Sequence, residues 1–161
     1  MAVRIVMKFQ IKSILGMLAF AFALNTFEAT SALADGHMEV IKERKALMKT
    51  ISKSNRIIKR YKKGRASADE AIKAAKELRK AMNDSIDERL YPKGSTRPDV
   101  EENETRAKAK VISEWDDFVE AGKKSAKRVT KFIKLAKAGA GEEVKFACGG
   151  CHKPYRGKKV K

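Results

Sequence analysis

Apolar residues recur every three or four positions through most of the chain after residue 35, which is the spacing of one face of an α-helix. The first stretch with this pattern extends from about Glu39 to Lys63 and ends at Gly64, a residue type that favours helix C-termini. Its predicted inner face consists of Val40, Leu47, Ile51, Ile58 and Tyr61. No stretch alternates apolar and polar residues as a strand does. The pattern therefore predicts helices.

Two further helical stretches follow. The second begins at a capping box, with Ser67 at the N-cap and Glu70 three residues later, and continues to about Leu90. Its apolar stripe consists of Ala71, Ala75, Leu78, Met82 and Ile86. Residues 91–99 contain two prolines and a glycine and are predicted to form a loop. The third stretch runs from about residues 101–105 to Lys137, and its inner face consists of Val111, Trp115, Phe118, Gly122, Val129, Phe132 and Ala136.

Glycines at positions 139 and 141 interrupt the third stretch, and a short fourth helix is predicted from Glu142 through both cysteines. Amphipathic helices joined by short connections bury their apolar stripes most simply as an antiparallel bundle. We therefore predict an all-α, antiparallel four-helix bundle for residues 35–161. The sequence shows neither an internal repeat nor a second domain.

The first 34 residues have the pattern of a secretory signal peptide. Three basic residues precede an apolar run from Ile14 to Leu24, and this run is too short to span a bilayer as a helix, which takes about 20 residues. The sequence Ala32-Leu33-Ala34 then provides a cleavage site of small residues. We expect cleavage after Ala34, a periplasmic location and no stable membrane insertion after cleavage. An uncleaved anchor is the alternative.

The chain contains 37 Lys and Arg against 20 Asp and Glu, which gives a formal net charge of +17. A surface this basic favours an acidic protein, an anionic membrane or nucleic acid as a partner. It is equally compatible with a well-solvated surface that has no partner. Because the chain is predicted to be exported, we expect no nucleic-acid partner.

The candidate chemistry is concentrated in Cys148-Gly149-Gly150-Cys151-His152. On a helix, two thiols three residues apart lie on one face and can add to the two vinyl groups along one edge of a haem. His152 then projects toward the iron and can bind it as a neutral imidazole. We therefore predict one covalently attached haem c, with Cys148 and Cys151 as its attachment points and His152 as an axial ligand. The fourth helix becomes the haem-attachment helix.

Other interpretations of the motif explain less. A redox dithiol would be expected in a βαβ context, and a structural zinc site needs four ligands, whereas His37 is the only other histidine. A disulfide would close almost no loop and would leave His152 unexplained. Arg156, four residues after His152, is expected on the same helix face, where it could pair with a haem propionate. The alternative is a solvated arginine of the basic tail.

The sequence resembles the class II cytochromes c, which comprise cytochrome c′ and its low-spin, methionine-ligated relatives. The resemblance rests on residues 148–156 (CGGCHKPYR), residues 44–49 (RKALMK), residues 90–95 (LYPKGS) and a tryptophan-led third helix, and it covers nearly the whole chain after the signal. It implies a four-helix bundle, a periplasmic location and a haem held between helices. The chain departs from the family in the short segment 142–147, in Pro154 and in its basic charge.

By this resemblance, Met48 stands at the position of the axial methionine in the low-spin members. In cytochrome c′ the same position holds a leucine or an unligated methionine. Helical spacing agrees that Met48 borders the inner stripe, next to Leu47 and three residues before Ile51. We expect Met48 to be the sixth iron ligand, although a methionine that only fills space in the core is the alternative. These surroundings supply no group for proton transfer, so we expect an electron carrier rather than an enzyme.

Two other functions stay open. A five-coordinate cytochrome c′ would bind nitric oxide or carbon monoxide at the free iron position. A haem-free basic helical module would bind anionic membranes or polymers. For the one-electron carrier, the basic residues near the C-terminal motif predict docking to an acidic redox protein. The many lysines of the first two helices predict a monomer or at most a weak homodimer.

Overall fold

The structure is a computed structural model that describes residues 37–101 and 103–159. The chain divides into two units, Met1–His37 and Met38–Lys161. The predicted signal peptide, residues 1–34, lies outside the described residues. The second unit contains the predicted bundle. None of the described helices is both long enough and apolar enough to cross a bilayer.

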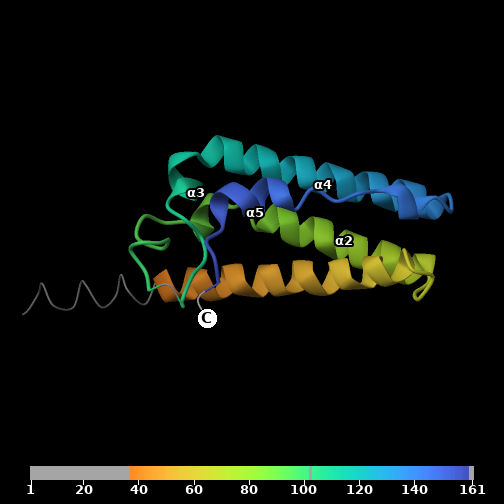
Figure 1. Cartoon of the computed structure of the whole chain (residues 1–161), viewed down its shortest axis with the longest axis horizontal. Coiled ribbons are helices and arrows are strands. Elements are labelled where there is room, and N and C mark those ends of the chain that lie inside the picture. Colours follow the sequence, from red (N-terminus) through yellow and green to blue (C-terminus); the bar gives the residue numbers. More distant parts are fainter. Residues whose placement is uncertain (1–36, 102, 160–161) are drawn as a thin grey trace, which may run out of the picture. The chain divides into compact units, whose positions relative to one another are not determined.

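The second unit is helical, which confirms the predicted all-α fold (Figure 1). A first helix covers residues 38–61 and is followed by α2 (Ala68–Asp84) and a 3-10 turn (Glu88–Leu90). The helices α3 (Lys110–Ser113) and α4 (Trp115–Lys137) come next. A second 3-10 turn (Gly141–Glu143) and α5 (Gly149–Tyr155) complete the unit. The described residues contain only two isolated β-bridges and no strand.

The connection between the first helix and α2 has the predicted form. Gly64 adopts a φ of 66°, and its N–H donates to Tyr61 O at 2.8 Å, which ends the first helix. The Oγ of Ser67 accepts from the Glu70 N–H at 3.2 Å, while the Glu70 carboxylate accepts from the Ser67 N–H at 2.9 Å. This capping box satisfies backbone groups that the first turn of α2 leaves unpaired.

Two predicted helix boundaries were wrong, and at the first of them side chains bind the backbone. The second helix ends at Asp84 instead of near Leu90, since Ser85 caps it and donates from Oγ to Met82 O at 2.8 Å. Asp87 then accepts from the Arg89 N–H at 2.9 Å and starts a separate 3-10 turn. The third helix begins only at residue 110, and Glu114, with a φ of −124°, separates α3 from α4.

The predicted fourth helix is also shorter than expected. Gly139, with a φ of 78°, ends the turn after α4, and Glu142 lies in a 3-10 turn. Val144 is extended, with φ −75° and ψ 116°, and residues 144–147 are not helical. The helix that carries the motif therefore begins at Gly149. Pro154 lies inside this helix.

Buried apolar side chains form two clusters. The larger cluster consists of Ile58, Tyr61, Ala71, Ala74, Ala75, Leu78, Met82, Ala126, Val129, Phe132, Ala136 and Val144. The smaller cluster consists of Leu90, Tyr91, Val111, Phe118 and Tyr155. The predicted inner faces are largely confirmed, although Ile41 is buried where Val40 was expected. Four other predicted positions are only partly buried against the clusters: Leu47, Ile51, Ile86 and Trp115.

Candidate functional site

A pocket of about 620 Å³ opens among the first helix, α2, α4 and α5. This volume lies within the range of about 300–1,000 Å³ that is usual for small-molecule sites. Its apolar lining comes from Ile41, Ile51, Met82, Ile86, Val111 and Phe118. Its charged lining comes from Arg44, Lys45, Glu104, Arg106 and Arg156. The pocket can therefore hold a group that is apolar at one end and anionic at the other.

Both cysteines and the histidine of the motif line this pocket. The two thiols are free and half-buried. Cys148 packs against the larger core cluster and Cys151 against the smaller one, so the α5 turn joins the two parts of the core. Burial raises the pKa of the Cys151 thiol, and the adjacent Cys148 raises it further. The Cys151 thiol is therefore protonated at neutral pH.

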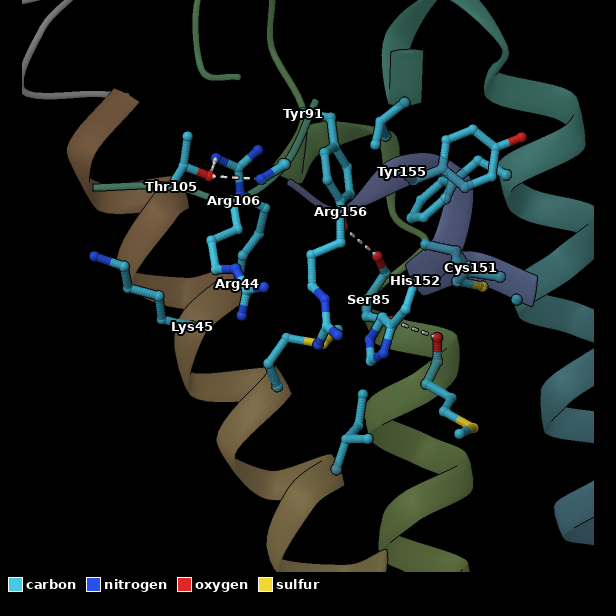
Figure 2. Close-up of a pocket in the computed structure, with 18 of the residues that line it drawn as sticks. Arg44, Lys45, Ser85, Tyr91, Thr105, Arg106, Cys151, His152, Tyr155 and Arg156 are labelled. Carbon is cyan, nitrogen blue, oxygen red and sulfur yellow. Dashed lines mark hydrogen bonds between the residues drawn. The ribbon is translucent and has the colours of Figure 1, made fainter. Parts of the chain in front are cut away.

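His152 projects from α5 into the space between the first helix and α2, with the Arg156 side chain beside it (Figure 2). Burial is the main cause that lowers the pKa of His152, and the positive charges of Arg156 and Arg106 lower it further. The imidazole is therefore neutral at pH 7 and can offer a lone pair to a metal.

Arg156 lines the pocket, as predicted. It does not project from the helix face that carries His152, so that part of the prediction was wrong. The residue is the C-cap of α5 and is extended, with φ −113° and ψ 127°. An antiparallel bridge to Ala107 holds it there, and the Gly157 N–H next to it donates to Arg106 O at 2.7 Å. The Arg106 side chain in turn donates to Gly157 O from Nε at 3.0 Å and from Nη2 at 2.8 Å. The extended backbone at the end of α5, rather than the helix itself, therefore places the Arg156 side chain in the pocket.

The first helix contributes Met48 and Ile51 to the pocket, whereas Leu47 packs against the smaller core cluster. Met48 is 38% exposed and belongs to neither cluster. A carboxylate, Glu104, also lines the pocket, although the sequence predicted none near Met48. Lys45 binds this carboxylate at 3.3 Å. Glu104 belongs to the loop before α3, whose path could not be predicted from the sequence pattern, and this loop brings it to the pocket.

Sequence reasoning assigned no role to Arg44, which is 94% buried and forms one wall of the pocket. Its guanidinium donates to Leu90 O at 3.1 Å, to Ser95 O at 2.5 Å and to the Thr105 hydroxyl at 3.4 Å. Burial lowers the pKa of Arg44. Arg44 thus ties the loop after α2 to the first helix. Its position three residues after Ile41 is compatible with the buried face but does not by itself distinguish it from the surface cations.

Side chains of α4 and of the turn after the first helix hold the extended segment 144–147 that leads to the motif. Lys62 donates to Val144 O, Arg128 donates to Lys145 O at 3.2 Å, and Ser125 donates to Ala147 O at 3.3 Å. These bonds replace the backbone bonds that a helix would supply. The segment therefore has a defined path without being helical, and this path fixes where α5 begins.

A haem fits the residues present. Its ring is apolar, its two propionates are anionic, and its vinyl groups lie along one edge. The pocket offers apolar walls, the cationic side chains of Lys45, Arg106 and Arg156, and two free thiols on one helix. Iron binds neutral imidazole well, and His152 is neutral. The helical bundle and this donor set define the class of haem proteins of the c type.

The comparisons with known proteins agree with this class. The family described as Cytochrome C′ matches residues 39–156. Among solved structures, the chain is similar to cytochrome c′ from Rhodobacter Spheriodes, with a TM-score of 0.65 and 25% sequence identity over 76% of this chain and 98% of that chain. No curated protein sequence matches the chain.

The chain belongs to the cytochrome c′ family, because the matched residues cover well over half of its length. The predicted resemblance to class II cytochromes c is thereby confirmed, as is the four-helix bundle. The predicted cofactor is confirmed at the level of the family, whose members carry a covalently attached haem c, typically one. The matched range includes Met48 and the whole C-x-x-C-H motif.

Proposed function

We propose that this protein is a five-coordinate cytochrome c′ that binds nitric oxide or carbon monoxide at the open position of its haem iron. The observation that carries this proposal is the match to cytochrome c′ over residues 39–156. This function replaces the His/Met-ligated electron carrier as the better supported of the two. The haem supplies the iron that binds the gas, and the chain supplies its attachment, one ligand and the surrounding walls.

Two residues of α5 and the two residues that cap it have separate roles in this proposal. Cys148 and Cys151 form the thioethers, because both thiols are free and line the pocket. His152 is the single protein ligand of the iron in this proposal, and burial and the nearby positive charges lower its pKa and keep the imidazole in the neutral form that binds a metal. Arg156 provides a positive charge for a propionate, and its extended backbone places it beside His152.

In this proposal Met48, from the first helix, narrows the space on the side of the haem away from His152 and does not bind the iron. Met48 lines the same pocket as His152. The match to cytochrome c′ supports the unligated alternative for this methionine. Ile51 adds an apolar side chain to the same wall. The side chains of Met48 and Ile51 suit a small, uncharged gas, because neither of them can pair with a charged ligand.

The electron carrier remains the second candidate because Met48 and His152 line the same pocket. A thioether ligand would give a low-spin iron with a high reduction potential and would exclude gases. The same residues therefore serve either function, and the coordination of Met48 decides between them.

The test uses the haem-loaded protein, its Met48→Ala variant and a Met48→Leu variant of similar size. We expect a high-spin spectrum for all three ferrous proteins and direct carbon monoxide binding by the wild type. The alanine variant should bind the gas faster, because the crowding side chain is removed. A low-spin wild type that becomes high-spin in both variants would instead establish the carrier.

We further propose that the chain is exported to the periplasm after cleavage at Ala34 and acts by binding rather than as an enzyme. The signal-like pattern of residues 1–34 supports export. For the carrier, the acidic redox partner remains a prediction, as does the monomeric or weakly dimeric state. N-terminal sequencing of the exported protein tests the cleavage site.

A further inference from the structure

The outer face of α4 carries seven cations and no acid between residues 121 and 141. The cations are Lys123, Lys124, Lys127, Arg128, Lys131, Lys134 and Lys137, and all of them are exposed. Arg128 donates to a backbone carbonyl, whereas no hydrogen bond or ion pair joins the six lysines to any other described residue. We call these seven residues the α4 basic face.

The cations of the α4 basic face repel one another. Every one of its cations has another cation three or four residues away, the spacing at which side chains on a helix are neighbours. Like charges at this spacing destabilise a helix. Arg79 of α2 adds a further cation close by, since it donates to Thr130 of α4 at 3.4 Å. A polyanionic surface would relieve this repulsion along the whole face.

The composition of the face favours a lipid headgroup surface over an acidic protein. Protein interfaces concentrate aromatic residues and arginine at their core and are depleted in lysine. The α4 basic face has six lysines and one arginine. The exposed large hydrophobic residues of the described chain, Met48 and Ile112, both lie outside it. Lysine is a mobile point charge that needs no fixed partner geometry, which suits a fluid array of phosphates.

We infer that the α4 basic face binds the anionic headgroups of a phospholipid bilayer. Residues 123–137 form a line about 22 Å long at 1.5 Å per residue, and this line contacts several headgroups at once. The attraction is electrostatic and screened by salt over about 10 Å at 0.1 M ionic strength. This binding would keep the cytochrome at a membrane surface without insertion. The inference does not depend on the axial ligands of the haem.

The test compares two variants with the same loss of charge. The first is the triple variant Lys123→Gln, Lys127→Gln, Lys131→Gln on α4. The matched control is Lys49→Gln, Lys53→Gln, Lys59→Gln on the first helix, where all three lysines are also exposed. Haem-loaded proteins are sedimented with vesicles of pure phosphatidylcholine or with 30% phosphatidylglycerol added, at low and at high salt.

We expect the wild type to bind only the vesicles with phosphatidylglycerol, and only at low salt. One lysine near an anionic bilayer contributes about fivefold to partitioning, so the α4 variant should lose about a hundredfold. The first-helix control should lose only a few fold. Equal losses in the two variants would overturn the inference, since net charge alone would then explain the binding.

Soluble polyglutamate provides the second arm of the test. If the α4 variant loses polyglutamate binding but retains vesicle binding, the face is a protein docking site and the inference fails. Circular dichroism should show that both variants keep their helices. The α4 variant should melt at an equal or higher temperature than the wild type, because three repelling charges are removed.

Discussion

The guanidinium carbon of Arg44 lies 4.9 Å from the ring centroid of Tyr91, and both residues are buried. The tyrosine ring attracts the cation, and its own hydroxyl donates to Ser85 O at 3.1 Å. Burial raises the pKa of Tyr91 to about 12. The first helix, the end of α2 and the following loop are thus joined by one stacked pair at the edge of the haem pocket.

Replacing Arg44 with methionine should destabilise the protein by about 2–4 kcal/mol, because buried carbonyl groups of Leu90 and Ser95 lose their donor. Methionine keeps the length of the side chain, so lost packing contributes little. The control is Lys45→Met, an exposed neighbour whose ion pair with Glu104 is worth at most about 1 kcal/mol. Urea unfolding of both variants measures the difference. Equal effects would mean that Arg44 does not anchor the loop.

Gly122 of α4 lies directly against Ile86, since a Cβ added to the glycine would be 2.5 Å from Ile86 Cγ2. Gly122→Ala should therefore cost about 1–3 kcal/mol and move α4 away from the end of α2. Both residues line the haem pocket, so its absorption spectrum should shift as well. In an Ile86→Ala background, which lacks Cγ2, the same Gly122→Ala change should cost much less stability than it does in the wild type. A stable Gly122→Ala protein would show that the helices adjust freely.

The sequence predicted the helices well where periodicity and local chemistry agree. The capping box at Ser67 and the glycine at position 64 mark helix ends through bonds within a few residues, so they can be read directly. The apolar stripes of α2 and α4 have the spacing of a helix and are buried. The motif at Cys148 was likewise readable, because its residues are adjacent in sequence.

Other features could not be predicted because they depend on contacts distant in sequence. The segment 144–147 has no helix since Lys62, Ser125 and Arg128 bind its carbonyls, and no local pattern shows this. The buried position of Arg44 depends on a loop about 50 residues away in the sequence. Because the residues next to Arg44 do not show this, the sequence does not distinguish it from the surface cations. The coordination of Met48 was predicted from resemblance, and family membership favours the other alternative.

Lys62 should control how firmly the segment before the motif is held. It donates to Val144 O and lies over the ring of Phe146, 5.4 Å from its centroid. In Lys62→Met we expect the Gly150 amide, which donates to Ala147 O, to exchange its hydrogen about five to ten times faster, since one bond of about 1 kcal/mol is lost. Lys62→Arg should restore protection, and the exposed Lys63→Met should change nothing. Unchanged exchange in Lys62→Met would assign the support to Ser125 and Arg128 alone.

The stability of the haem-free protein should fall as the pH decreases below about 6.5, the pKa of a histidine in an unfolded chain. Burial and the charges of Arg156 and Arg106 lower the pKa of folded His152, so below this pH the unfolded chain binds a proton that the folded chain does not. Stability is therefore complete above pH 6.5 and declines from there until the folded pKa is reached. Arg156→Gln should raise the folded pKa and make the decline smaller, whereas Arg156→Lys should keep it. NMR titration of the imidazole measures the pKa, and urea unfolding at several pH values measures the decline. The same pKa in the wild type and Arg156→Gln would show that the arginine charge does not reach His152.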